Sequence, residues 1–180
     1  MNITFTIITS LIFLFVLILI IAAITKKEYH VKRDIIIKSK ADIVFDYIKH
    51  LKNQLNYNIF LSRDNTVNIE YEGVDGEKGF KLSWEGKKSG MGVQEIIKIQ
   101  EGKQFDYELN FLKPFKGRAS AKFILECLND DEVELTWSFE SGMNYPMNFL
   151  LLFLNMDKIL GNDVHSGLRK LKEILEQTNR

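Results

Sequence analysis

A carboxylate occupies a position where the sequence pattern predicts the buried, apolar face of a strand. Glu95 falls on the same alternate positions as Met91, Val93, Ile97 and Ile99, and this period of two is typical of a strand with one buried side. An isolated buried carboxylate is costly, so it either finds a partner or has a raised pKa. Three roles stay open for Glu95: a polar anchor for a ligand, a general acid or base, or a structural carboxylate bonded to a nearby helix or loop.

A second carboxylate, Asp157, shares the apolar face of a predicted C-terminal helix with Leu154 and Gly161. One hypothesis directs the Asp157 carboxylate into a ligand cavity. The other pairs it with a basic strand residue, either Arg118 or Arg33. Gly161 is expected to let this helix approach a sheet closely.

Four aromatic residues share the predicted inward positions of neighbouring strands: Trp84, Tyr107, Trp137 and Phe139. Aromatic walls suit an apolar or ring-bearing ligand, and the indole N–H and phenol O–H could orient it. The alternative is that these rings only fill the core. We predict a mainly apolar cavity lined by these rings and Leu154, with Glu95 as its principal polar group and Asp157 as a second.

Composition narrows the classes of function. Lys and Arg total 24, as do Asp and Glu, and this zero net charge argues against a nucleic-acid-binding protein. The single Cys127 excludes an intrachain disulfide and a cysteine zinc site. The histidines, His30, His50 and His165, show no metal-binding spacing, and no nucleophile elbow or phosphate-binding glycine motif is present. The sequence therefore predicts no metal, no cofactor and no recognisable catalytic constellation.

Hydrophobic periodicity indicates the elements that must position these residues. A β-branched run predicts a strand over 28–38, and helical spacing predicts a short helix over 40–51 that begins after Ser39. Residues 52–66 are polar with scattered apolar positions, which favours a second short helix followed by a loop.

The rest of the chain changes period twice. Residues 66–141 hold six alternating segments separated by turn residues, which predict an antiparallel meander. Residues 147–176 predict one long amphipathic helix that begins after Pro146. The sheet and the helix must each cover the other's apolar face, so we predict an α+β helix-grip fold, a curved antiparallel sheet wrapped around a long C-terminal helix.

The N-terminal segment has the composition of a transmembrane helix. Residues 1–25 contain no charged side chain, and a helix over 3–24 would reach about 33 Å, enough for a hydrocarbon core of about 30 Å. A cleaved signal peptide is the alternative, but no basic residue precedes the apolar run. Lys26 and Lys27 follow it, and basic residues beside a span stay in the cytoplasm. We expect a single-pass inner or plasma membrane protein with an anchor (1–25) and a cytoplasmic domain (26–180).

A series of short motifs runs along the predicted domain. In order they are Trp84-Glu85-Gly86, Gly90-Met91-Gly92 with Glu95, Pro114-Phe115, Thr136-Trp137-Ser138-Phe139, Tyr145-Pro146-Met147-Asn148, Met156-Asp157-Lys158 with Gly161, Gly167-Leu168 and Leu171-Lys172. In this order and spacing, residues 29–176 resemble the SRPBCC superfamily, which includes START domains and polyketide cyclase/dehydrase-like proteins. More narrowly, they resemble its bacterial membrane-anchored members of unassigned activity. The resemblance implies the helix-grip fold and an apolar cavity.

Three functions remain open. The first is a membrane-tethered module that binds a hydrophobic or lipid-like small molecule without catalysis. The second is an enzyme of the cyclase, dehydratase or hydrolase type that uses Glu95, with Asp157 as a further group, for acid–base chemistry. The third is a protein-interaction module, since some relatives with this fold act on chaperones. An apolar cavity with a polar anchor would favour the binding module. A carboxylate within reach of a bound ligand would favour the enzyme, and a filled core with an exposed apolar patch would favour the protein-interaction module.

Overall fold

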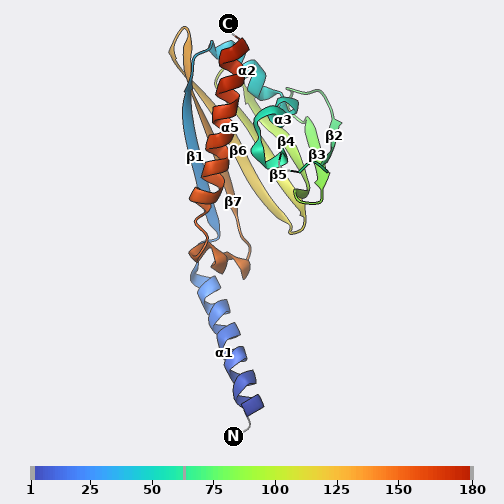
Figure 1. The fold of residues 1–180 in the computed structure, drawn as a ribbon, viewed down its shortest axis with the longest axis vertical. Helices are drawn as coiled ribbons and strands as arrows, with labels where there is room; N and C mark the ends of the chain where they lie inside the picture. Colours follow the sequence, from blue (N-terminus) through green and yellow to red (C-terminus); the bar gives the residue numbers. More distant parts are fainter. Residues whose placement is uncertain (1–2, 63, 179–180) are drawn as a thin grey trace.

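A single antiparallel sheet, with a long helix packed along it, organises the computed structural model, which describes residues 3–62 and 64–178 (Figure 1). The strand order is β1-β7-β6-β5-β4-β3-β2, so the first strand pairs with the last and the others form a meander. The strands are β1 (Glu28–Ile37), β2 (Asn68–Glu72), β3 (Lys81–Gly86), β4 (Gly90–Gln100), β5 (Gln104–Lys113), β6 (Gly117–Asn129) and β7 (Glu132–Gly142). The helices are α1 (Ile3–Ile24), α2 (Ala41–Lys49), η1 (Leu51–Asn53), α3 (Gln54–Tyr57), α4 (Ile59–Ser62), η2 (Met147–Leu152) and α5 (Met156–Thr178). The expected helix-grip fold is confirmed.

The core lies between the inward face of the sheet and α5. In β7, Val133, Leu135 and Trp137 are buried, because residues two apart in a strand share a face. In α5, Leu168 and Leu171 are buried at a three-residue step and meet those strand side chains. The predicted alternation on β7 and the predicted helix face are therefore correct here.

The predicted orientation of β4 is wrong for residues 91–95 but correct for Ile99, which packs against the core, and a β-bulge is the reason. Ile96 pairs with Tyr107 and Lys98 pairs with Asp106, so Ile97 is an extra residue without a cross-strand partner. A bulge shifts the alternation by one residue, so odd-numbered positions face one side of the sheet before the bulge and the other side after it.

Before the bulge, Gly92, Gln94 and Ile96 are the buried residues of β4. Glu95 therefore lies on the outer face of the sheet, half-buried and paired in register with Lys81 of β3 and Glu108 of β5. A carboxylate beside a lysine at a solvated sheet face needs no cavity to explain it.

The C-terminal helical region is divided in two, contrary to the prediction of one helix over 147–176. Residues 147–152 form the 3₁₀ helix η2, and α5 begins only at Met156. The Asn155 side chain accepts a hydrogen bond from the backbone N–H of Lys158 at 2.9 Å, which caps the new helix. Leu154 precedes this cap and is exposed, so it does not share a helix face with Gly161.

The apolar helix α1 extends from one end of the domain (Figure 1). Its length and composition are sufficient to cross a membrane, which is the property expected of the segment 3–24. The helix meets the domain through η2, where Asn148 Nδ2 donates to the carbonyl oxygens of Ala22 at 2.7 Å and Thr25 at 2.9 Å. These contacts satisfy carbonyl groups at the end of a helix that have no intrahelical partner.

Candidate ligand-binding site

An apolar cavity of about 210 Å³ lies between the sheet and the first half of α5. Aromatic side chains supply much of its wall: Tyr29, Phe60, Trp84, Tyr107, Phe111, Trp137 and Phe139. Aliphatic side chains complete it: Ile59, Leu109, Met156, Leu160 and Val164. The polar residues in the wall are Asn58, Gln94 and Asp163. Such a site, mostly apolar with a few polar groups, suits a small hydrophobic molecule.

Trp84 is held against one side of the cavity by a glycine on the next strand. Trp84 pairs in register with Gly92, and a Cβ at Gly92 would clash with the indole ring. The ring can therefore occupy this place only because position 92 has no side chain. The indole Nε1 donates to the Ser89 carbonyl oxygen at 3.2 Å, and Phe111 meets the ring edge-on at a centroid distance of 5.8 Å.

Trp137 and Tyr107 form a hydrogen-bonded aromatic pair beside the cavity. Trp137 Nε1 donates to the Tyr107 hydroxyl oxygen at 3.1 Å, and the indole stacks on Phe123 at a centroid distance of 4.8 Å. Burial raises the pKa of Tyr107 well above its ordinary value, so its hydroxyl is neutral near pH 7. Because its oxygen already accepts from Trp137, the Tyr107 hydroxyl has a proton to donate.

An uncharged polar network borders the same wall. Gln94 Nε2 donates to Gln54 Oε1 at 2.7 Å, and both side chains are buried. The Gln54 amide also lies near the Tyr107 hydroxyl, and this proximity partly opposes the rise in the Tyr107 pKa. Among the described residues, Gln54 Nε2 has no partner within hydrogen-bond geometry. Neutral amides and a phenol are thus the polar groups that a ligand on this side would meet.

The structure brings together four of the seven residues predicted for the site: Trp84, Tyr107, Trp137 and Phe139 all line the cavity. The other three predicted residues, Glu95, Leu154 and Asp157, are not part of the wall. Glu95 lies on the opposite face of the sheet, so an acid–base role for it inside this cavity is contradicted. Leu154 lies outside α5.

Asp157 forms an ion pair, which was the alternative to a cavity position. Its Oδ1 lies 2.9 Å from Arg33 Nη1, and Arg33 Nη2 donates to Oδ2 at 3.0 Å. The guanidinium lowers the pKa of the Asp157 carboxyl, which keeps it ionised. The guanidinium occupies the space beside Gly161, where a Cβ would clash with it, so Gly161 makes room for this ion pair.

Sequence reasoning missed the polar residues of the cavity. The alternation of β4 predicts an outward position for Gln94, because the bulge at Ile97 leaves no mark in the sequence pattern. Asn58 lies between two single-turn helices, in a segment that no sequence pattern placed beside the sheet. Leu109 and Phe111 could have been found, since they share the alternation of Tyr107 on β5.

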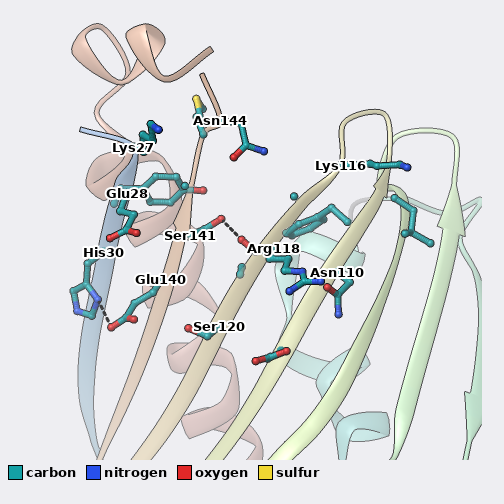
Figure 2. Close-up of a pocket in the computed structure, with 18 residues that line it drawn as sticks. Lys27, Glu28, His30, Asn110, Lys116, Arg118, Ser120, Glu140, Ser141 and Asn144 are labelled. Carbon is teal, nitrogen blue, oxygen red and sulfur yellow. Dashed lines mark hydrogen bonds and ion pairs between the residues drawn. The ribbon is translucent and has the colours of Figure 1, made fainter. Parts of the chain in front are cut away.

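A second, larger concavity lies on the outer face of the sheet and is open to solvent (Figure 2). Its side chains carry both signs of charge, and His30 Nδ1 lies 3.1 Å from a Glu140 oxygen. Ser141 Oγ donates to the Arg118 backbone carbonyl oxygen at 2.9 Å. Mixed, solvated charges select no particular ligand, so the aromatic cavity is the candidate site. Among the residues that the structure describes, no cluster of His, Cys, Asp and Glu could hold a metal ion.

Comparison with known proteins identifies the fold. Norcoclaurine synthase from Thalictrum flavum, solved in complex with dopamine and hydroxybenzaldehyde, matches with a TM-score of 0.62 and 9% identity over 88% of this chain and 91% of that chain. The Aha1 dimer from Colwellia psychrerythraea matches with a TM-score of 0.56 and 12% identity over 82% and 96% of the two chains. Protein CV1439 from Chromobacterium violaceum matches with a TM-score of 0.58 and 11% identity over 82% and 96%. No protein-family model and no curated protein matches the sequence.

The chain therefore has an SRPBCC/Bet v1-type helix-grip fold, a class in which a curved sheet and a terminal helix enclose a cavity. Structural similarity at identities this low establishes the fold alone, so the function must be argued from the site.

Proposed function

We propose that this protein binds a small hydrophobic or lipid-like molecule in the cavity between the sheet and α5, without catalysing a reaction on it. The observation that supports this proposal is the cavity wall, which combines aromatic rings with the buried, uncharged Gln94 amide and holds a single carboxylate, that of the half-buried Asp163. The proton of the Tyr107 hydroxyl and the Gln94 amide suit a ligand with one neutral polar group, such as a carbonyl or hydroxyl.

The size of the cavity limits the ligand. About 210 Å³ is below the roughly 300–1,000 Å³ of sites for drug-sized molecules. The proposed ligand is therefore a single ring system with a short substituent, or one segment of a longer lipid chain. A complete two-chain phospholipid is too large for this cavity.

We further propose that residues 1–25 anchor the ligand-binding domain, residues 26–180, to a membrane. The apolar helix α1 supports this, since its side chains are exposed along nearly its whole length and would be solvated by lipid. Lys26 and Lys27 immediately after α1 favour a cytoplasmic position for the domain.

Native mass spectrometry of the full-length protein, extracted from membranes in mild detergent, tests for a co-purified ligand. In parallel, the neutral fluorophore N-phenyl-1-naphthylamine serves as a ring-bearing probe. We expect saturable binding at one probe per protein. Leu160→Trp should abolish saturable binding, because the larger side chain would fill the cavity that Leu160 now lines.

Two matched variants separate the cavity from the outer face. Gln94→Leu removes a polar group from the wall and should weaken binding of a ligand that carries a hydrogen-bonding group. Glu95→Gln changes the neighbouring residue on the opposite face and should leave binding unaltered. Equal loss of binding in both variants, or binding that Leu160→Trp does not reduce, would contradict the proposed site.

A further inference from the structure

Besides Tyr145, four large apolar side chains of the segment between β7 and α5 are exposed at the end of the domain where α1 emerges. Exposed fractions are 48% for Met147, 58% for Leu152, 77% for Phe153 and 38% for Leu154. We call these four residues the η2 patch. Residues 141–156 contain no charged side chain, so the residues that flank the patch along the chain are all uncharged. A group of exposed apolar side chains of this kind marks an interaction surface.

The position of the η2 patch relative to α1 indicates what covers it. Asn148 of η2 bonds to the carbonyl oxygens of Ala22 and Thr25, and Ala22 is completely buried. The patch therefore lies beside the last turn of α1 (Figure 1). A helix over 3–24 is about 33 Å long, so its last turn lies close to the boundary of a hydrocarbon core of about 30 Å.

The charges around the patch fit the same location. Lys26 and Lys27 lie just beyond the end of α1, after Thr25, and are exposed, and lysine side chains at this depth extend to the lipid headgroups. Apolar and aromatic side chains beside them would lie at the acyl-chain boundary, where burial of Phe153 and Leu152 removes apolar surface from water.

We propose that the η2 patch inserts into the membrane surface and fixes the orientation of the domain on the bilayer. This rests on the proposed function, because it requires α1 to span the membrane. Two of the residues that line the cavity lie near this end of the domain: Tyr29, near the start of β1, which follows α1, and Met156, at the start of α5, which follows η2. An inserted patch therefore holds this end of the ligand cavity against the lipid.

Nitroxide labels on single cysteines test the proposal in the full-length protein, reconstituted into vesicles of phosphatidylcholine with a minority of phosphatidylglycerol. Labels are placed at position 153, at position 13 within α1, and on the native Cys127, with Cys127→Ser as the background for the first two. Phe153 and Phe13 are 77% and 71% exposed, so a label at either site leaves the core intact. Cys127 is exposed near the end of β6, next to the β6–β7 turn.

Collision with oxygen, which concentrates in lipid, is compared with collision with a water-soluble nickel chelate. We expect labels at 153 and 13 to collide mainly with oxygen and the label at 127 mainly with nickel. A water-exposed label at 153 beside a lipid-exposed label at 13 would overturn the proposal while leaving the anchor intact. A water-exposed label at 13 would overturn both. Spin–spin broadening at 153 without lipid contact would assign the patch to a second copy of the chain, and this too would overturn the proposal.

Discussion

Replacing Trp137 by alanine should cost about 3–5 kcal/mol in the free energy of unfolding, as deletion of a large buried aromatic side chain does. Trp137 is 5% exposed, stacks on Phe123 at 4.8 Å and meets Tyr57 edge-on at 6.0 Å, so a methyl group in its place removes the indole against which both rings pack. The deletion also removes the N–H that bonds to the Tyr107 hydroxyl.

A second substitution separates packing from hydrogen bonding. Trp137→Phe keeps a ring against Phe123 but has no N–H, so we expect a smaller loss of about 1–2 kcal/mol. Combining Trp137→Phe with Tyr107→Phe completes a double-mutant cycle, in which the bond should appear as a coupling energy of about 0.5–1.5 kcal/mol. Glu134→Ala, on the opposite face of β7, is the control and should change stability by no more than about 0.5 kcal/mol.

Urea unfolding in mild detergent measures these differences. The fluorescence of Trp84 reports on the domain, because it is the one remaining tryptophan once Trp137 is replaced. A cost below about 1 kcal/mol for Trp137→Ala would refute the burial of this ring. Strict additivity in the cycle would refute the hydrogen bond to Tyr107.

Three further predictions concern residues that hold the site in place. The carboxylate of Asp64 accepts hydrogen bonds from loop N–H and hydroxyl groups, and these bonds hold its pKa well below the ordinary value. The ionised Asp64 therefore stabilises the folded state fully above the unfolded-state pKa of about 3.9, and this stabilisation is lost as pH falls below it. Asp64→Asn should flatten this acid dependence in urea unfolding. Gly92→Ala should destabilise by about 1–3 kcal/mol and shift the fluorescence of Trp84, since the new methyl group would overlap its indole; unchanged emission would contradict that contact. Gly161→Ala should displace the Arg33 guanidinium and return the carboxyl pKa of its aspartate partner towards the ordinary value in an NMR titration, and a pKa that stays low would show that the ion pair does not need the glycine.

Much of the fold follows from local patterns in the sequence. The alternation of Phe105, Tyr107 and Leu109 predicts the inward face of β5, and the structure buries or half-buries all three. Such patterns succeed where one strand face meets the core without interruption, because apolar side chains two residues apart then report directly on burial. They fail at β4, where the inserted Ile97 reverses the alternation and moves Gln94 rather than its acidic neighbour to the buried face.

The sequence by itself determined the order of the strands, the apolar helix at the N-terminus and the inward face of four aromatic residues of the cavity wall, because each depends on a pattern among residues close together in the chain. Tertiary structure decided which face of β4 is buried, since a bulge is defined only by pairing with β5. It also decided between two possible partners of Asp157: Arg33 is the one that faces α5, on the β1 strand against which that helix packs. The break before α5 arises where η2 turns to cap α1, a contact between residues more than a hundred positions apart. These features depend on which distant segments meet, and local periodicity carries no information about that.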